Sequence, residues 1–486
     1  MWQPKQTKMN NSKIAVGLDI GATKIVALVG KKNDNGKIEI LGYGHAPSLG
    51  VHRGVVNNIT QTINSIKLAV SQAEAMSGIK IEEVTVGIAG QHIRSLQHSD
   101  YITRLNAEEV IDEEDLRLLI NQVYKLVMLP GEEIIHVLPQ EYKVDNEDEI
   151  EEPIGMYGSR LEANFHVVIG QVASIRNIAR CVKNAGLRLS GITLEPLASS
   201  NAALSPEEKE AGVALVDIGG GTTDIAVFKD NVIRHTSVIP FGGNVISEDI
   251  KTGCSIIGRQ AELLKERYGS AWPGENKETE IVSIPGLKGR GSKEISLKRL
   301  SQIINARVQE IFEQVFLELK NYGCEEQNSK LIAGIVLTGG GSKLKHIRQL
   351  TEYITGMDVR IGYSNEHIVG AKAEELSGPE YATAVGLLMK GIEELENKQM
   401  KELYANPMTE NIIGSMSKDS SSDQTLNLSK AETENKEKHQ NKEEEKEDEL
   451  MGVKLGSKVK SSEKPKKSNI FSKWTDKFIQ MINETE

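Results

Sequence analysis

The chain has 486 residues, of which 69 are Asp or Glu and 58 are Lys or Arg, giving a formal net charge of -11. This length exceeds what a single hydrophobic core organises, so we expect more than one domain. The acidic balance argues against a nucleic-acid partner, because phosphate binding depends on clustered Lys and Arg side chains.

The cysteines and the N-terminal segment argue against a disulfide-stabilised, zinc-binding, secreted or membrane-spanning protein. Cys181, Cys254 and Cys324 lie far apart in the sequence, so we expect buried free thiols in place of a disulfide framework or a zinc site. Residues 1–10 lack the apolar run of a signal peptide, and no stretch reaches the ~18 apolar residues of a membrane span. We therefore expect the protein to stay in the cytoplasm.

The alternation of short and long apolar patterns predicts an α/β fold. Apolar, β-branched runs broken by a glycine turn occur at 13–29 and 212–228, and helical periodicity follows each. The segments 57–76 and 297–321 carry apolar residues at helical spacing, and 84–88 is a compact strand. Helices should therefore cover sheets in two related halves.

A first glycine turn, DIGATK, follows the first strand. Glycine lets backbone N–H groups approach a phosphate closely, the aspartate suits Mg²⁺, and hydroxyl and lysine side chains can contact phosphate oxygens. One such turn alone is a weak signal, because glycine hairpins between strands are common. The residues of this turn that we expect to act are Asp19, Gly21, Ala22, Thr23 and Lys24.

The segment 193–202, TLEPLASSNA, reads as a strand that ends at an acidic residue and a proline opening a helix. Glu195 could orient a water toward a γ-phosphate. It could equally be an acid at a helix N-terminus that only complements the helix dipole. The residue pattern leaves both interpretations open.

A second glycine turn, DIGGGTTD, begins at Asp217, 198 residues after Asp19. In both copies an aspartate is followed by a glycine turn that contains hydroxyl side chains, and an apolar strand comes next. This repetition indicates two halves built on one plan. Two copies strengthen the case for phosphate binding. The residues of the second copy are Asp217, Gly219, Gly220, Gly221, Thr222 and Thr223.

A third glycine cluster, TGGGS, follows an apolar strand at 332–337 and precedes a predicted helical stretch at 343–355. A turn without side chains there can lie flat against a nucleoside. The chain has no GxxxxGK[ST] string, so it has no P-loop, and no GxGxxG string follows the first strand, which argues against a dinucleotide fold. The residues of this third cluster are Gly339, Gly340, Gly341 and Ser342.

The composition changes after about residue 398. Residues 399–467 are rich in Glu, Lys, Ser and Asn and cannot bury enough apolar surface to order, so a disordered linker is predicted. Residues 468–486 then show apolar side chains on about half of a helical wheel. These apolar residues are Ile470, Phe471, Trp474, Phe478, Ile479, Met481 and Ile482.

The terminal pattern predicts an amphipathic helix that lies on a membrane. The thirteen residues from Ile470 to Ile482 would form a helix about 20 Å long at ~1.5 Å rise per residue, which is too short to span a bilayer. Eight lysines against two acids at 451–477 favour an anionic membrane surface. A helix that folds back on the globular region, or that pairs with a partner, is the alternative.

These features in this order resemble the actin, Hsp70 and sugar-kinase superfamily, and within it the FtsA family of cell-division proteins. The family resemblance rests on four strings over roughly residues 12–396. They are GIAGQHI (87–93), HVLPQEYKVD (136–145), PIGMYGSRLEANFHVV (153–168) and KRLSQIINARVQEIFE (298–313).

The resemblance implies an actin-like two-lobed ATPase fold with four subdomains and a role for each glycine cluster. The two turns would hold the phosphates of ATP, with Asp19 and Asp217 toward Mg²⁺, and Gly339 to Ser342 the adenosine. Asp19, Asp217 and Glu195 would form the catalytic group, with slow turnover in which nucleotide acts chiefly as a conformational ligand.

The family's subdomain plan implies the following boundaries. The first-lobe core would cover 12–92, 172–210 and 366–398, the inserted subdomain 93–171, the second-lobe core 211–254 and 331–365, and its small subdomain 255–330.

The resemblance also implies partners and a location. FtsA-like proteins polymerise and tether FtsZ filaments to the cytoplasmic face of the inner membrane at the septum, together with other division proteins. The FtsZ tail would dock within 255–324, with Lys298, Arg299 and Arg307 as candidate contacts for an acidic peptide. A pilus-assembly relative and a small-molecule kinase of the same superfamily are the alternatives.

Overall fold

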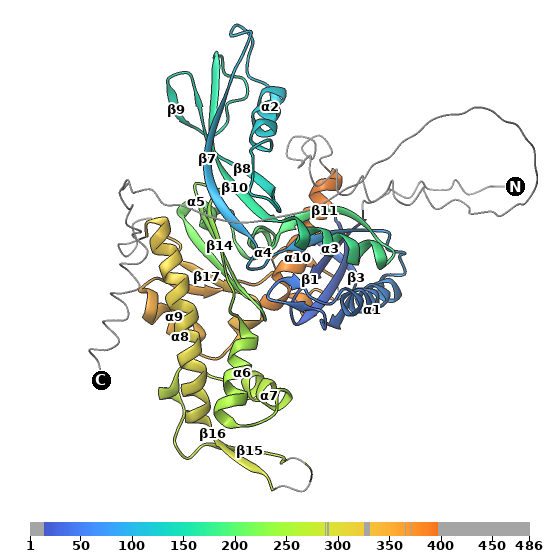
Figure 1. Ribbon diagram of the computed structural model, residues 1–486, viewed down its shortest axis with the longest axis vertical. Coiled ribbons are helices and arrows are strands. Elements are labelled where there is room, and N and C mark those ends of the chain that lie inside the picture. The colour runs from blue at the N-terminus through green and yellow to red at the C-terminus, as the bar shows by residue number, and fades with distance from the viewer. Residues whose placement is uncertain are drawn as a thin grey trace, which may run out of the picture. The chain divides into compact units, whose positions relative to one another are not determined.

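The computed structural model describes residues 14–286, 288, 291–324, 331–364, 366–370 and 372–396. Within these ranges the chain builds two large β-sheets with helices packed on their faces (Figure 1). The predicted linker at 399–467 and the predicted terminal helix at 468–486 lie outside the described residues.

The first-lobe sheet has the strand order β11-β6-β1-β2-β3-β19. Strands β1, β2 and β3 form an antiparallel meander, and β6 and β11 extend the sheet in parallel beside β1. β1 is buried from its second residue onward, as expected of a strand with both faces covered. The strands are β1 (Ile14–Ile20), β2 (Lys24–Lys32), β3 (Ile38–Pro47), β6 (Glu83–Ile88), β11 (Arg188–Leu194) and β19 (Ile368–Val369).

Helices α1 (Ile59–Ser77) and α3 (Val172–Asn184) share an apolar core with the outer face of this sheet. α1 begins where the Asn58 side chain accepts a hydrogen bond from the Gln61 backbone N–H, and it ends at Gly78, whose φ is 70°. The sequence pattern predicted this helix over 57–76, within two residues of its observed ends.

The second-lobe sheet has the order β14-β13-β12-β17-β18 and repeats the plan of the first. An antiparallel meander is again followed by parallel strands. This repetition agrees with the internal similarity of the two glycine turns. The strands are β12 (Val213–Ile218), β13 (Thr223–Lys229), β14 (Val232–Ile239), β17 (Ile335–Thr338) and β18 (Val359–Ile361).

Two helices, α4 (Glu195–Ala203) and α10 (Ala382–Glu396), lie between the sheets. Their apolar side chains form one core with residues of both sheets, including Leu28 and Leu215. The packing is close, because a Cβ atom on Gly386 of α10 would overlap the carbonyl of Ala198 in α4. The two lobes are therefore joined through a pair of touching helix backbones.

The inserted subdomain consists of a four-stranded antiparallel sheet, ordered β7-β10-β8-β9, and one helix. It has its own apolar core, centred on Phe165 and Leu161. The elements are β7 (Arg94–Thr103), α2 (Glu113–Val123), β8 (Glu132–Val144), β9 (Glu147–Ile150) and β10 (Arg160–Gln171).

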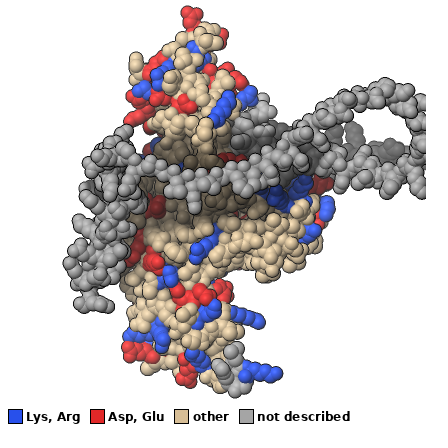
Figure 2. Space-filling view, viewed as in Figure 1, with Lys and Arg blue, Asp and Glu red and all other residues tan. Residues whose placement is uncertain are grey.

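Among the remaining elements, the long helix α8 packs on α6 and α9, and the short helix α5 packs on β13. Lys and Arg side chains project around the β15–β16 hairpin, at the lower end of the view in Figure 2. These elements are α5 (Pro206–Ala211), α6 (Gly243–Cys254), α7 (Gly258–Tyr268), β15 (Ile281–Ile284), β16 (Lys293–Ser296), α8 (Leu297–Tyr322) and α9 (Ile347–Thr355). The 3₁₀ turns are Pro273–Glu275, Gly340–Lys343, Glu374–Leu376 and Pro379–Tyr381.

The helix predicted at 343–355 is shorter than expected. A 3₁₀ turn covers Gly340–Lys343, and α9 starts only at Ile347. The cause is His346, whose φ of 62° is left-handed and interrupts a right-handed helix.

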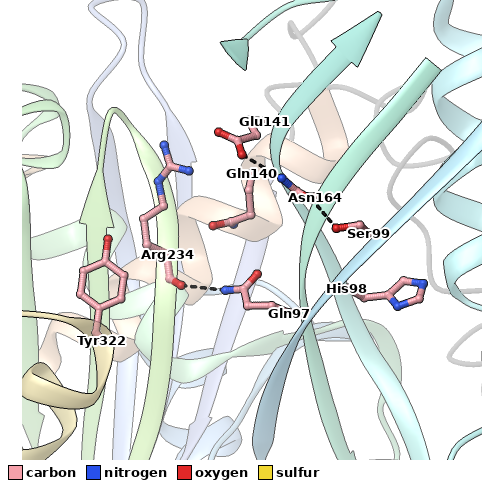
Figure 3. Close-up of a pocket in the computed structure, with 8 residues that line it drawn as sticks. All are labelled: Gln97, His98, Ser99, Gln140, Glu141, Asn164, Arg234 and Tyr322. Atoms are coloured by element: carbon pink, nitrogen blue, oxygen red, sulfur yellow. Dashed lines mark hydrogen bonds between the residues drawn. The ribbon is translucent and has the colours of Figure 1, made fainter. Parts of the chain in front are cut away.

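The inserted subdomain contacts the edge strand β14 of the second lobe through side chains. Ser95 Oγ donates to the Thr236 carbonyl at 3.0 Å, Gln97 Nε2 donates to the Arg234 carbonyl at 3.1 Å, and Gln140 donates to the Ile233 carbonyl. A cavity of about 370 Å³ opens beside these contacts (Figure 3). Its lining residues are Gln97, His98, Ser99, Gln140, Glu141, Asn164, Arg234 and Tyr322.

Candidate functional site

The first glycine turn connects β1 to β2 and is placed by their pairing. Ile20 pairs with Ile25, so the chain reverses over 21–24 at the end of a buried hairpin. Asp19 is 7% exposed, and burial raises its pKa to about 6, against the lowering effect of Lys24 and with a further rise from Asp217. The carboxylate therefore holds its proton more tightly than an ordinary aspartate.

The second glycine turn connects β12 to β13 in the same way. The Gly219 N–H donates to the Thr222 carbonyl at 2.9 Å, which closes the turn. Thr222 Oγ1 donates to Asp224 Oδ2 at 2.9 Å, and Thr223 Oγ1 donates to the Phe241 carbonyl at 2.8 Å. These bonds fix the hydroxyl-bearing side of the turn to the body of the second lobe.

The structure brings the two turns into direct contact. A Cβ atom on Gly220 would overlap the side chain of Thr23, and one on Gly221 would lie 2.9 Å from Ala22 Cβ. Only glycine lets the backbone of the second turn approach the Thr23 and Ala22 side chains of the first turn this closely. The hairpin β4 (Val51–His52) to β5 (Val55–Val56) also contributes, because Arg53 lies against the same glycine.

Asp217 is held by hydroxyl groups from the two central helices. Ser199 Oγ on α4 donates to Asp217 Oδ2 at 2.6 Å, and Thr383 Oγ1 on α10 donates to the same oxygen at 3.1 Å. Burial raises the pKa of Asp217, and these two bonds oppose the rise. The sequence prediction missed both hydroxyl residues.

Glu195 is the first residue of α4 and directly follows β11. Its side chain lies against Gly87 of β6, where a Cβ atom would come within 2.7 Å of the Glu195 Cγ. Burial raises the pKa of Glu195 well above its ordinary value, and Asp19, Asp224 and Asp217 raise it further. The acid predicted from the sequence therefore lies among the aspartates of both turns.

Four carboxyl groups, Asp19, Glu195, Asp217 and Asp224, thus share one buried region. Burial and the charge of Asp217 raise the pKa of Asp224 to about 7, and its Oδ1 has no hydrogen-bond partner among the described residues. A cation placed here would offset their mutual repulsion. Within the described ranges no three His, Cys, Asp or Glu side chains form a preassembled metal site.

The third glycine cluster packs against the second turn. Gly339 has a φ of 78° and a ψ of 169°, and a Cβ atom on it would overlap Asp217 Oδ1. Its N–H donates to the Pro379 carbonyl at 3.1 Å, and Ser342 Oγ donates back to the Gly339 carbonyl at 2.7 Å. Gly340 and Gly341 continue the turn, and Gly341 approaches Ile218.

A lysine and a tyrosine complete the surroundings of the turns. The Lys24 ammonium lies 4.1 Å from the ring centroid of Tyr381, a cation–π contact. Burial lowers the pKa of Lys24, while Asp19 and Glu380 oppose that change. Lys343 Nζ is bonded to Glu380 Oε1 at 2.6 Å. Two positive groups therefore accompany the acidic ones.

The predicted membrane-binding residues at 470–482 lie outside the described residues. Among the described helices, none combines the length and the apolar character needed to cross a bilayer.

Two family models match the chain. The model described as "Cell division protein FtsA" matches residues 214–386, and the model described as "SHS2 domain inserted in FTSA" matches residues 90–169. The second match falls on the inserted subdomain with its strands β7 to β10.

Curated relatives match over most of the chain. The cell division protein FtsA of Pseudomonas aeruginosa is 40% identical over 385 residues, which are 79% of this chain and 91% of the relative. That of Neisseria meningitidis serogroup B is 41% identical over 371 residues, 76% of this chain and 88% of the relative.

A solved "PilM-PilN type IV pilus biogenesis complex" matches with a TM-score of 0.54 and 17% identity, over 78% of this chain and 98% of that chain. At this identity the likeness concerns the fold alone, which is the actin-like ATPase fold. By its family models and its relatives, the chain belongs to the FtsA family of cell division proteins.

Proposed function

We propose that this protein binds ATP with Mg²⁺ between its two lobes and tethers FtsZ polymers to the cytoplasmic face of the cell membrane at the division site. The observation that supports it most is the contact between the glycine turns of the two lobes, Gly220 against Thr23 and Gly221 against Ala22. A ligand held by both turns would fix the lobes in one relative position. Family membership supports the cellular role.

The phosphates would lie against the backbone of the two turns, 21–24 and 219–223, where the Gly219 N–H is already bonded to the Thr222 carbonyl and Lys24 is the nearby positive charge. The loop Gly339 to Ser342 would lie against the nucleoside. Because Gly339 packs on Asp217, occupancy of the nucleoside side would bear directly on the second turn.

Asp19 and Asp217 fit Mg²⁺. The Asp224 Oδ1 atom is buried without a hydrogen-bond partner among the described residues, and the pKa values of Asp19 and Asp224 are raised. Both observations indicate a region where a bound cation would be favourable. Mg²⁺ prefers oxygen ligands and usually keeps several waters, so one or two carboxylates suffice alongside phosphate. When bound it would neutralise phosphate charge.

Glu195 would orient the attacking water, and we expect slow turnover. Its carboxyl group is buried and adjacent to three aspartates, so it holds a proton more tightly than usual and is a weak base until a cation arrives. Nucleotide would then act mainly by selecting a conformation.

The test of this site is ATP binding and phosphate release with and without Glu195→Ala. We expect ATP affinity within about twofold of the unmodified protein, since Glu195 would face the water, and phosphate release slower by at least about tenfold. A protein that ignores ATP in solution would refute the nucleotide proposal. Brisk release that the substitution leaves unchanged would refute the role of Glu195 alone.

The FtsZ tail would dock on the small second-lobe subdomain at 255–324. The three candidate contacts differ in their ion pairs: Arg307 is bonded to Asp249 and Glu310, whereas Lys298 pairs with the exposed Glu278 at 2.6 Å. The Arg299 guanidinium donates to the Gly253 carbonyl. Lys298 and Arg299 are therefore better suited to an acidic peptide than Arg307.

A charge reversal tests the docking surface. Lys298→Glu with Arg299→Glu should weaken binding of an FtsZ tail peptide by about tenfold, because two favourable charges become repulsive. The matched control is Lys251→Glu, which changes an exposed lysine on α6 of the same lobe. Equal effects of the two changes would contradict docking at Lys298 and Arg299.

The terminal segment 468–486 would attach the protein to anionic lipids. A chain truncated before Ser468 should no longer co-sediment with vesicles containing phosphatidylglycerol, whereas the full chain should. Unchanged sedimentation would refute membrane attachment through this segment. Electron microscopy of the full chain with ATP on lipid monolayers would show whether the attached protein also forms filaments.

A further inference from the structure

A histidine of the inserted subdomain reaches the last residue of β11. The Leu194 backbone N–H donates to His136 Nε2 at 3.1 Å. Among the described strands β11 is at the edge of the first-lobe sheet, so its outward N–H groups face no strand partner there. The imidazole supplies the acceptor that a neighbouring strand would otherwise provide.

The local geometry of β8 directs His136 to this position. His136 pairs with Val168, whereas Ile134 pairs with Ile169, so Ile135 is an extra residue that forms a bulge. Bulges bend a strand and redirect the side chains that follow. His136 directly follows the bulge, and its side chain contacts β11 of the first lobe.

His136 is suited to accept this bond. Burial, assisted by the charge of Lys390, lowers its pKa to about 4, so the ring is neutral at pH 7. Because Nε2 accepts from Leu194, the ring proton of the neutral form resides on Nδ1. The contact is therefore a neutral hydrogen bond to backbone.

The residue after Leu194 is Glu195. Helix α4, which Glu195 opens, has no side-chain cap at its N-terminus, so local side chains do not hold this backbone. The Glu195 stem lies in the space left by Gly87, which limits its movement toward β6. The orientation of the carboxyl group thus depends on the backbone at Leu194.

We propose that His136 is a positioning residue for Glu195: through the Leu194 N–H, the inserted subdomain fixes the strand end from which the carboxylate reaches the nucleotide site. The inference rests on the proposed role of Glu195 in ATP turnover. Any rotation of the inserted subdomain that moves β8 would then change turnover without touching the nucleotide.

The test compares substitutions at His136 in the full-length protein, with ATP affinity and phosphate release both measured. His136→Met removes the acceptor at similar volume and should slow release by about fivefold, the worth of one neutral hydrogen bond, with ATP affinity within twofold. His136→Gln places an amide oxygen where Nε2 was and should restore the rate to within twofold. His98→Met, in β7 of the same sheet, is the matched control and should change neither quantity.

A second arm separates positioning from general damage. In a Glu195→Gln background, His136→Met should cause no further loss, because the group that it positions is already inactive. An additive loss, a loss of ATP affinity equal to the loss of rate, or no rescue by His136→Gln would each overturn the proposal. If ATP itself fails to bind the unmodified protein, the proposed function fails first, and positioning with it.

Hydrogen exchange gives a readout that does not depend on turnover. The Leu194 amide should be protected in the unmodified protein and in His136→Gln, and should exchange at least about tenfold faster in His136→Met. If His136→Met does not fold, the other two proteins still test the proposal. Rapid exchange of the Leu194 amide in the unmodified protein would overturn it, and protection of that amide in both the unmodified protein and His136→Gln would uphold it.

Discussion

Substituting alanine for Gly339 should disable the proposed nucleotide site without removing any functional group. The φ of 78° and ψ of 169° lie in a region essentially reserved for glycine, where another residue costs about 1–3 kcal/mol. A Cβ atom there would also overlap Asp217 Oδ1 and lie 2.6 Å from the Ile218 carbonyl. The methyl group can be accommodated only if Asp217 or the turn moves.

Movement of Asp217 would disturb the second glycine turn, because Ser199 and Thr383 hold its carboxylate in one place. We expect ATP affinity to fall by at least about tenfold, which corresponds to about 1.4 kcal/mol. The assay is a titration with a fluorescent ATP analogue, run beside urea unfolding so that strain and lost binding are measured separately.

Gly36 provides the matched control. It also has a φ of 78°, but a Cβ atom there would meet nothing within 4 Å, and it lies in the turn between β2 and β3. Gly36→Ala should cost about 1–2 kcal/mol of stability from its left-handed backbone and leave ATP affinity unchanged. If folded Gly339→Ala bound ATP as tightly as Gly36→Ala, the reasoning about the third glycine cluster would be wrong.

Three further predictions follow from buried polar groups. Asp224 has a pKa of about 7 when folded against 3.8 as its ordinary value, so its contribution to stability is fully present below 3.8 and is lost as pH rises through 7. Asp224→Asn should therefore raise the unfolding midpoint of the nucleotide-free protein at pH 8 more than at pH 5, and an equal shift at both would contradict this. Ser199→Ala removes a bond to a buried carboxylate and should weaken Mg²⁺-dependent ATP binding by roughly 1.5–3 kcal/mol, measured by calorimetry, whereas Ser71→Ala, at an exposed position of α1, should not. Arg104, whose side chain is 6% exposed, donates to the carbonyls of Val110 and Gly158 and pairs with Asp115 at 2.8 Å. Arg104→Met should cost roughly 3–5 kcal/mol and make 90–169 sensitive to limited proteolysis, while the half-exposed Arg160→Met should leave the cleavage pattern unchanged.

The two glycine hairpins of the proposed nucleotide site could be predicted from the sequence. A glycine turn between two apolar strands is encoded by neighbouring residues, so DIGATK and DIGGGTTD identified both hairpins that the structure places in contact. The α/β fold followed from the same strings and from the helical periodicity after them. The family resemblance then supplied the order of the subdomains.

The contacts between distant segments could not be predicted. Ser199 and Thr383 lie 18 and 166 residues from Asp217, and a hydroxyl residue in a helix has no pattern that marks it as a carboxylate partner. His136 is likewise 58 residues from Leu194, and the bulge at Ile135 that directs it depends on pairing with β10. Arg307 looked like a free basic residue because Asp249, its partner, is on another helix.

The touching backbones of α4 and α10 have a consequence for how the lobes can move. Gly386 leaves no side chain between the helices, so Ala198 and its neighbours rest directly on the opposite backbone. A joint of this kind tolerates rotation about the crossing point but little separation, since any gap would expose the apolar residues of both sheets at once. If the two glycine turns separate when the proposed nucleotide exchanges, we therefore expect the lobes to rotate about this helix contact, and a methyl group added at Gly386 should hinder that rotation.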